Sequence, residues 1–252
     1  MANRFIVGNW KMHNTISQAE TLIRDILAIY QANPSVELAV APPYVALQSV
    51  SHLLASTPIK LAAQNVCAKD EGAFTGEISP FMLKELGCQY VIIGHSERRH
   101  LFGESDQAIN EKIHAALHHD LQPIFCIGER LEEREAGQTH SVIQHQLQTG
   151  LAGLEIKDLS NITIAYEPVW AIGTGHAATV EQATEVHAAI RSSLATHWKL
   201  NSEHIRILYG GSVTPNNAQA LFQSPHINGA LIGKACLHSE SFVKIAELAA
   251  SD

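Results

Sequence analysis

The feature that most constrains the fold of this chain is a regular alternation of short β-type runs with segments of helical periodicity. Runs rich in apolar and β-branched residues recur at residues 5–7, 38–41, 59–63, 90–93, 123–127, 162–166, 205–209 and 230–232. Between them, apolar residues follow the spacing of an amphipathic helix, for example over residues 17–30, 106–119, 180–198 and 239–249. The sequence therefore predicts successive βα units.

Strict alternation of strand and helix predicts a parallel sheet, because each helix returns the chain to the same end of the sheet by a right-handed crossover. The length of 252 residues fits a closed (β/α)8 barrel that occupies residues 1–252 as a single domain, since such barrels commonly take about 250 residues. An open doubly wound sheet is the alternative.

Charge and cysteine usage narrow the possible partners and the compartment. The formal net charge is −8, so nucleic acid and anionic membrane surfaces would repel the chain, although a small anionic substrate is compatible with local positive groups. No apolar run reaches the roughly 18 residues of a membrane span. The four cysteines, Cys67, Cys88, Cys126 and Cys236, have no paired spacing, which favours reduced thiols and a cytoplasmic location over disulfides or zinc.

The predicted sixth strand, 162–166, delivers Glu167 to its C-terminal end, where barrel enzymes form their active sites. Pro168 biases Glu167 away from helical backbone and ends the strand. Residues 169–175 are too apolar for an ordinary surface loop, and their two glycines can absorb backbone change, which predicts a lid over a small ligand. The alternative is a surface glutamate followed by an irregular turn.

Two other strand ends carry polar residues that could take part in chemistry. Asn9 and Lys11 follow the first strand, and the two-residue period predicts that their side chains share a face. His95 follows the fourth strand at the expected start of a helix, which favours a neutral imidazole that donates a hydrogen bond. Each also fits a structural role, as a solvated lysine or a backbone-bonded histidine. Arg98 and Arg99 resemble a structural ion network.

Glycine-rich turns follow the predicted seventh and eighth strands, at 209–213 and 231–234. Successive backbone N–H groups in such turns can bind an anion, and barrels often hold a phosphate there. A Gly-Gly-Ser turn is weak evidence by itself, and neither turn matches a P-loop or a dinucleotide fingerprint.

No metal site is predicted from the histidines. His114 and His118 lie four residues apart on a predicted helix, but the end of that helix favours cationic side chains through the helix dipole. The other histidines lack ligand spacing.

Residues 65–79 form a connection of about fifteen residues without a predicted element, which is uncommon in a compact domain unless the loop has a function. Phe74 lies near its expected tip, and an exposed phenylalanine there predicts contact with another subunit. The alternative is a mobile surface loop.

Short motifs spread along the chain resemble those of one family. They are GNWK at 8–11, QN at 64–65, GAFTGE at 72–77, GHSERR at 94–99, CIGE at 126–129, YEPVWAIGTG at 166–175 and YGGSV at 209–213. On these motifs together, and on their order, the chain is similar to the triosephosphate isomerase family.

The resemblance implies an isomerase of glycolysis and gluconeogenesis that interconverts glyceraldehyde 3-phosphate and dihydroxyacetone phosphate. It implies that Glu167 is the base and that His95 is the neutral group that polarises the carbonyl. Lys11 and Asn9 would stabilise the negative oxygen and the phosphate, with Glu97 as a supporting carboxylate near Lys11. Such a reaction needs a base, oxyanion donors and a water-free site, and no metal or other cofactor.

The resemblance also implies how the phosphate is held. Gly173 in the lid, Ser212 and Gly233 would supply phosphate contacts. Ile172 and Leu231 would keep water away from the base.

Members of the family are homodimers, and the resemblance implies one here. The loop with Phe74 and Thr75 would insert beside the partner's Asn9 and the partner's Lys11.

The chain departs from the family pattern at the eighth-strand turn, where Lys234 replaces a frequent glycine and Cys236 a frequent serine. Lys234 can still offer a backbone N–H to the phosphate, and its charge would favour an anion, but a positive φ at this position would cost about 1 kcal/mol or more.

Two other functions stay open on the sequence. One is a phosphosugar aldolase that uses a lysine Schiff base, with Lys60, Lys84 or Lys234 as the lysine. The other is a barrel that binds a phosphosugar without catalysis.

Overall fold

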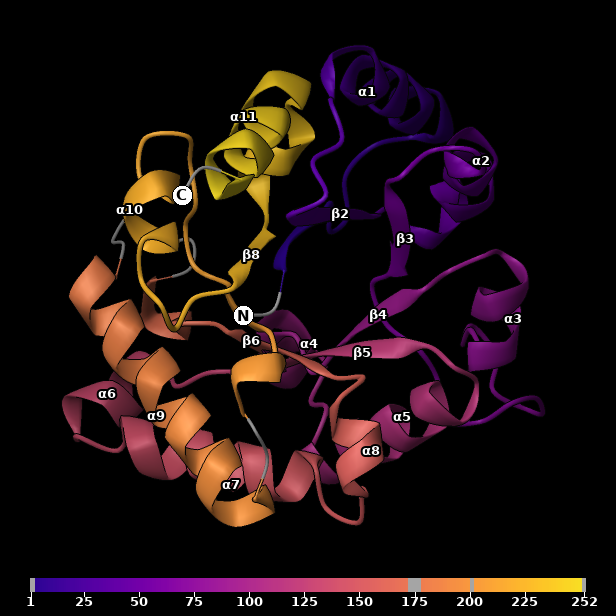
Figure 1. Cartoon of the computed structure of the whole chain (residues 1–252). Coiled ribbons are helices and arrows are strands. Elements are labelled where there is room, and N and C mark those ends of the chain that lie inside the picture. Colours follow the sequence, from indigo (N-terminus) through magenta and orange to yellow (C-terminus); the bar gives the residue numbers. More distant parts are fainter. Residues whose placement is uncertain (1–2, 172–177, 200–201, 251–252) are drawn as a thin grey trace.

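The computed structural model describes residues 3–171, 178–199 and 202–250. In this part of the chain, parallel strands close into a barrel in sequence order, and helices surround it (Figure 1). The strands are β1 (Arg4–Asn9), β2 (Val36–Ala41), β3 (Lys60–Ala63), β4 (Tyr90–Ile93), β5 (Gln122–Ile127), β6 (Thr163–Tyr166), β7 (Ile207–Tyr209) and β8 (Gly229–Ile232). The predicted (β/α)8 barrel is confirmed, and the open sheet is excluded.

The helices follow the strands as expected from the apolar periodicity. They are α1 (Ile16–Ile29), α2 (Tyr44–Leu54), α3 (Pro80–Glu85), α4 (Ser96–Leu101), α5 (Asp106–His118), α6 (Leu131–Glu135), α7 (Thr139–Gly150), α8 (Ile156–Leu159), α9 (Val180–Trp198), α10 (Ala218–Phe222) and α11 (Ser239–Ala250). Short 3-10 helices are η1 (Val169–Ala171), η2 (Ser202–His204) and η3 (Lys234–Leu237). None of the described helices is both long and apolar enough to cross a membrane.

The barrel closes where β8 pairs with β1, in a register that runs from Phe5↔Gly229 to Gly8↔Ile232. Gly229 has a φ of 142°, and a Cβ there would lie 1.9 Å from the Phe5 carbonyl oxygen. Only glycine therefore allows β8 to begin at this point.

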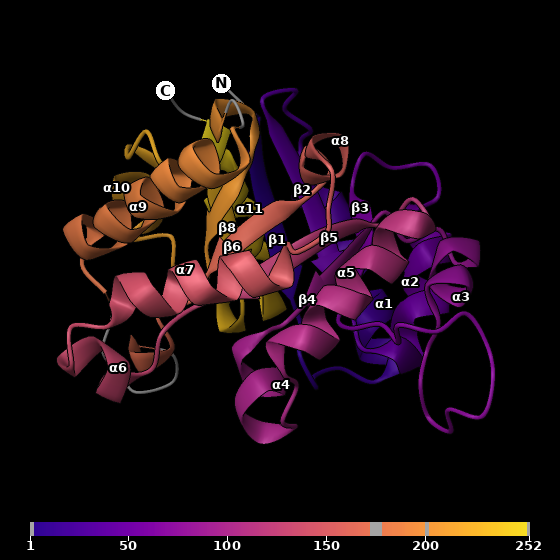
Figure 2. The ribbon, with the colours of Figure 1, turned by 90° about the horizontal axis from the view of Figure 1, so that it is seen from below.

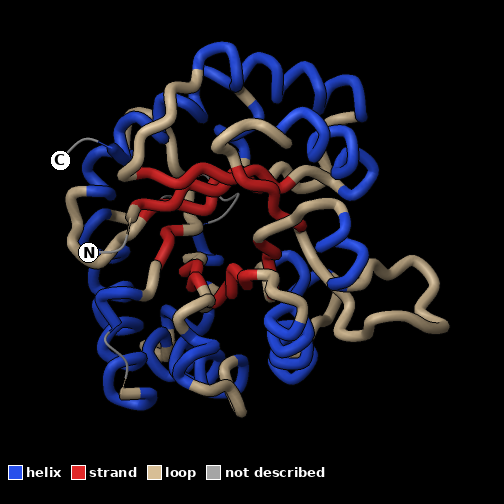
Figure 3. The backbone as a smooth tube through the Cα atoms, turned by 45° about the vertical axis from the view of Figure 1, so that its right-hand side comes forward, coloured by secondary structure: helices blue, strands red, loops and turns tan. Residues whose placement is uncertain are grey.

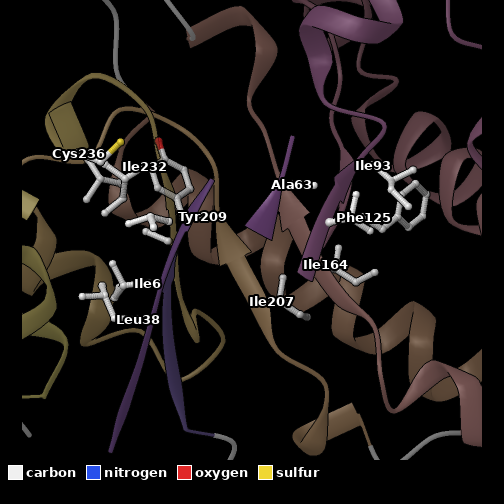
Figure 4. Close-up of a cluster of buried hydrophobic side chains, with 14 of the residues drawn as sticks. Ile6, Leu38, Ala63, Ile93, Phe125, Ile164, Ile207, Tyr209, Ile232 and Cys236 are labelled. Atoms are coloured by element: carbon white, nitrogen blue, oxygen red, sulfur yellow. The ribbon is translucent and has the colours of Figure 1, made fainter. Parts of the chain in front are cut away.

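Side chains of each strand alternate between two buried layers. The layer inside the barrel contains Phe5, Val7, Ala39, Ala41, Ala62, Tyr90, Ile92, Ile124, Cys126, Ala165, Leu208 and Leu231. The larger layer lies between the strands and the helices, and Figure 4 shows part of it, including Ile6, Phe125 and Ile207. This alternation fixes which residues point into the barrel as each strand ends.

Strand boundaries differ from the predicted ones by one or two residues except at β4, and the difference at the end of β1 affects the site. Asn9 is the last residue of β1, paired in register with Ala41, rather than a residue after the strand. The helical turn η2 directly before β7 delays the start of that strand to Ile207. β8 begins at Gly229, one residue earlier than predicted.

The long connection between β3 and α3 contains no helix or strand, as predicted. A hydrogen bond from Cys67 N to Ile78 O, at 2.8 Å, closes its base. The loop projects from the body of the barrel (Figures 2 and 3).

Candidate active site

The interior layer of the barrel turns polar at the C-terminal ends of the strands. The interior positions Val7 of β1, Ala62 of β3 and Ala165 of β6 are apolar. Two residues further on, the same faces reach Asn9, Gln64 and Glu167. Because side chains on one face of a strand recur every two residues, these three belong to the interior face at the barrel mouth. Asn9 and Glu167 are buried there.

The carboxylate of Glu167 is held by neutral donors. Ser96 donates its backbone N–H to Oε2 at 2.9 Å and its hydroxyl to Oε1 at 3.0 Å. His95 Nε2 lies 3.1 Å from Oε1. Gly210 packs directly on this side chain, since a Cβ at 210 would lie 2.8 Å from the Cγ of Glu167. The strand-end glutamate is therefore a buried, oriented acceptor rather than a surface side chain.

His95 is the N-cap of α4, which explains its tautomer. Its Nδ1 accepts a hydrogen bond from the backbone N–H of Glu97 at 3.2 Å, so the ring proton resides on Nε2 and faces Glu167. Gly94, with a φ of 75°, makes the left-handed turn that brings His95 from β4 to this cap. The neutral, donating imidazole expected from the sequence is consistent with this geometry.

Lys11 joins the site through a backbone conformation that the sequence reasoning did not anticipate. It has a φ of 51°, so it has left the strand, and the two-residue period is the wrong reason for its position. Two contacts hold this conformation: Lys11 N donates to Asn9 Oδ1 at 3.1 Å, and Gln64 Nε2 donates to Lys11 O at 2.8 Å. Lys11 Nζ then pairs with Glu97 Oε1 at 2.5 Å.

The eighth-strand turn also lies close to the Lys11 side chain. A Cβ on Gly233 would lie 3.6 Å from Lys11 Cε, and Leu231 is buried in the interior layer. Lys234 is exposed and opens η3. It is not among the described residues with positive φ, so the strain considered above for a lysine is absent. Ser212 is exposed in the turn after β7.

Cys236, the second departure from the family pattern, is buried behind this turn. Burial raises the pKa of its thiol, which stays protonated.

Two predicted site residues, Ile172 and Gly173, lie outside the described residues. Trp170, which precedes them, donates its Nε1–H to Glu129 Oε1 at 3.0 Å. The same oxygen accepts from Arg134 Nη1 at 3.0 Å and from the Tyr166 hydroxyl at 3.1 Å. The described start of the predicted lid is therefore tied to a fully buried carboxylate.

Sequence reasoning gave no role to Ser96, Gln64 or Glu129, which support the site. Gln64 could have been found, because it stands two residues after an interior position of β3. Ser96 and Glu129 belong to the motifs at 94–99 and 126–129. Their contacts could not be predicted, because they join segments that are far apart in the sequence.

The ion network at the start of α4 divides between two arginines. Arg98 and Lys112 both pair with Glu104. Arg99 instead pairs with Asp106. Glu97 pairs with Lys11 rather than with either arginine.

The alternative chemistries find no support in the geometry. Lys60 stands at the first residue of β3, at the other end of the barrel, Lys84 bonds an exposed carbonyl oxygen, and Lys234 is exposed. His114 bonds the Ala152 carbonyl oxygen at 2.9 Å. The described residues contain no group of three or more His, Cys, Asp or Glu that could hold a metal.

Comparison with known proteins gives a consistent result. A family model described as triosephosphate isomerase matches residues 4–249. A protein named triosephosphate isomerase from Chloroflexus aurantiacus is 48% identical over 241 residues, which cover 95% of this chain and 96% of the relative. Relatives with the same name from Dictyoglomus thermophilum and Aquifex aeolicus are 47% identical over 98% of this chain and 49% identical over 96% of it, and the alignments cover 100% and 98% of those proteins.

Proposed function

Because this chain belongs to the triosephosphate isomerase family, we propose that the residues at the barrel mouth divide the reaction of that family among them. The enzyme interconverts D-glyceraldehyde 3-phosphate and dihydroxyacetone phosphate, an intramolecular aldose-ketose isomerisation in glycolysis and gluconeogenesis. The reaction moves a proton between adjacent carbons through an enediolate.

Glu167 is the base in this proposal. From dihydroxyacetone phosphate it removes a proton from C1, and the electron pair of the broken C–H bond forms the C1–C2 double bond while the C2 oxygen takes the negative charge. Delivery of the proton to C2, with transfer of the hydroxyl proton between the two oxygens, gives glyceraldehyde 3-phosphate. The observation that carries the assignment is a buried carboxylate that is held by uncharged groups, among them the Ser96 backbone and hydroxyl and the His95 imidazole.

His95 is the electrophile. Its Nδ1 is occupied by the Glu97 N–H, so the Nε2–H can donate to an enediolate oxygen and stabilise the charge that develops there. The short distance between this nitrogen and Glu167, 3.1 Å, supports a substrate position in which base and electrophile act on neighbouring atoms.

Lys11 and Asn9 stabilise negative charge on the substrate. Lys11 is fixed by Asn9 and Gln64 through its backbone and by Glu97 through its ammonium group. A cation held in this way costs little reorganisation when charge develops on an oxygen. Glu97 is a supporting carboxylate that orients it.

The substrate phosphate lies against the two glycine-rich turns. Backbone N–H groups around Ser212 and Gly233 hold it, and Lys234 adds a positive charge, while Leu231 helps to exclude water. Support comes from the proximity of Gly233 to Lys11. On the sequence alone, we also assign Gly173 as a phosphate contact and Ile172 as a residue that keeps water away from the base.

The functional unit is a homodimer. Apolar side chains exposed in the single chain follow β1 to β4, the four strands that neighbour one another on one side of the barrel; they are Met12, Val45, Phe74, Phe81 and Phe102. Exposed apolar side chains after neighbouring strands support burial against a second copy, with Phe74 and the exposed Thr75 at the contact. Phe74→Asp should shift the protein to monomer in sedimentation equilibrium, and a monomeric wild type would contradict the proposal.

A cytoplasmic location is supported by the four free cysteines.

Solvent exchange tests the catalytic assignment. Wild-type enzyme in deuterium oxide should incorporate deuterium into dihydroxyacetone phosphate, whereas Glu167→Gln should not. Glu185→Gln, which alters an exposed glutamate of α9, is the matched control and should exchange like the wild type. Absence of exchange in the wild type would refute catalysis, and exchange by Glu167→Gln at the wild-type rate would refute the base. Borohydride with substrate should trap no covalent adduct.

A further inference from the structure

Arg99 connects the ends of two strands at the barrel mouth. Its Nε donates to the Gly94 carbonyl oxygen at 2.7 Å, and its Nη2 donates to the Cys126 carbonyl oxygen at 3.0 Å. These carbonyls belong to the end of the β4 segment and to β5, which are neighbours in the barrel. One planar guanidinium, 8% exposed, therefore fixes the relative position of two strand ends.

Each of these carbonyls lies next to a group of the site. The Gly94 carbonyl is part of the peptide bond to His95. The Cys126 carbonyl is part of the peptide bond to Ile127, whose own carbonyl oxygen accepts the backbone N–H of Glu167 at 2.8 Å. The guanidinium thus holds the peptide from which His95 starts and, one residue removed, the backbone on which Glu167 is anchored.

The thiol of Cys126 gives a second link to Glu167. Cys126 pairs in register with Ala165 of β6, two residues before Glu167, and burial, followed by the charge of Glu167, raises the pKa of its thiol. A displacement of this strand end would therefore reach the Glu167 side chain as well as its backbone.

A third contact keeps the guanidinium in place. Nη1 pairs with Asp106 Oδ1 at 2.5 Å, and Asp106 is in the first turn of α5, where a carboxylate is favoured by the helix dipole. Three donors are used in three directions. A lysine, which is a single point charge, cannot satisfy both carbonyls and the carboxylate at once.

We propose that Arg99 is a positioning residue for the isomerisation, which sets the distance between the His95 imidazole and the Glu167 carboxylate. The proposal rests on the roles given above to His95 and Glu167. The Arg99 backbone N–H bonds the His95 carbonyl oxygen at 3.1 Å. Its guanidinium bonds Gly94 O, Cys126 O and Asp106 rather than the imidazole or the carboxylate, so the side chain acts through the two backbone carbonyls. Small misplacement of reacting groups lowers the rate of the chemical step much more than it changes binding.

The test compares Arg99→Lys and Arg99→Ala with a matched arginine at the other end of the barrel. Arg206 is half-buried and pairs with Glu37 at 2.6 Å, so Arg206→Lys removes a similar guanidinium far from the site. Arg99→Lys should lower kcat by about 10- to 100-fold with a KM within about threefold of wild type. Arg206→Lys should leave both constants unchanged.

Chemical rescue separates positioning from general destabilisation. Dilute guanidinium chloride, well below a denaturing concentration, should raise kcat of Arg99→Ala without changing KM, and should not raise kcat of Arg206→Ala. Thermal unfolding of each variant checks that the assayed protein is folded.

The proposal is overturned if Arg99→Lys keeps kcat within twofold of wild type, or if KM rises as much as kcat falls. A loss in Arg99→Ala that guanidinium does not reverse overturns it as well. Glu167→Gln, assayed in parallel, distinguishes failure of the Arg99 proposal from failure of the proposed function. An active Glu167→Gln refutes the proposed base, whatever the Arg99 variants show.

Discussion

A glutamate lies at each end of the barrel, and the two glutamates have different kinds of partner. At the N-terminal end, Glu37 of β2 accepts from the Tyr90 hydroxyl at 2.6 Å and pairs with Arg206 at 2.6 Å. Arg206 also stacks on Phe5, 4.2 Å from its ring centroid. At the mouth, Glu167 is bonded by Ser96 and His95, and no lysine or arginine pairs with it among the described residues.

The difference shows what each carboxylate can do. Glu37 is held in place by the counter-charge of Arg206. The donors to Glu167 are uncharged, and substrate can take the place of the His95 contact, which is the arrangement that our proposal for the base requires. The N-terminal end of the barrel is thus held together by an ion pair, whereas the mouth carries the base of our proposal.

The largest predicted effect after that of Glu167 concerns the cation of the mouth. Lys11→Met should lower kcat/KM by about 100- to 1000-fold, because a fixed charge that stabilises the developing oxyanion is lost. Steady-state kinetics in both directions measure it. Lys60→Met, which alters the lysine at the base of β3, should behave like wild type. A kcat/KM of Lys11→Met within tenfold of the wild-type value would contradict the different roles given to the two ends of the barrel.

The sequence predicted the frame of this comparison but only part of its detail. The regular spacing of the β-type runs predicted the barrel. Pro168, which follows a β-type run, predicted that Glu167 lies at the end of a strand. The left-handed backbone of Lys11 could not be predicted, because it depends on the hydrogen bond that Lys11 N–H donates to Asn9 and on the one that Lys11 O accepts from Gln64, which follows β3.

The same limit applies to the partners of Glu167. Ser96 is 71 residues away in sequence, and only closure of the barrel brings the two together. The three-way contact of Arg99 depends in the same way on the positions of β4, β5 and α5.

A buried histidine just outside the mouth should give the protein a characteristic acid sensitivity. His187 packs against Tyr166 and Tyr209, the last residues of β6 and β7, and bonds the Ala183 carbonyl oxygen at 2.7 Å. Burial lowers its pKa from 6.5 to about 4. His187 therefore binds a proton below about pH 6.5 in the unfolded chain, but only below about pH 4 in the folded chain.

The free energy of unfolding should therefore fall by about 3 kcal/mol from this group as the pH drops through that window, with the full contribution present above it. Urea unfolding at a series of pH values measures the slope. In His187→Asn, which keeps a donor for Ala183, the slope should flatten. An unchanged slope would show that other groups cause the acid sensitivity.

A smaller effect is expected at the base of the barrel. Arg206→Lys should lower the free energy of unfolding by about 1–2 kcal/mol, since a lysine cannot reproduce the contacts with Glu37, Tyr90 and Phe5, and partial exposure limits the loss. Urea unfolding checks the value. A fall in kcat with no change in stability would reverse the roles given to the two ends.

The smallest effect is predicted at Lys234. Lys234→Gly should change KM by less than about tenfold, or about 1.4 kcal/mol, because the side chain is exposed and the backbone N–H remains available. Titration of KM against ionic strength shows how much of the change is electrostatic. A larger loss would make Lys234 a main phosphate ligand.

The most direct test of the contrast is to remove one charge from each end with an isosteric change and to measure kcat and the free energy of unfolding together. Glu167→Gln should lose about a thousandfold or more in kcat, with stability within about 1 kcal/mol of wild type. Glu37→Gln should lose about 1 kcal/mol of stability and keep wild-type kcat. A Glu167→Gln enzyme that retains activity, or a Glu37→Gln enzyme that loses it, would contradict the account.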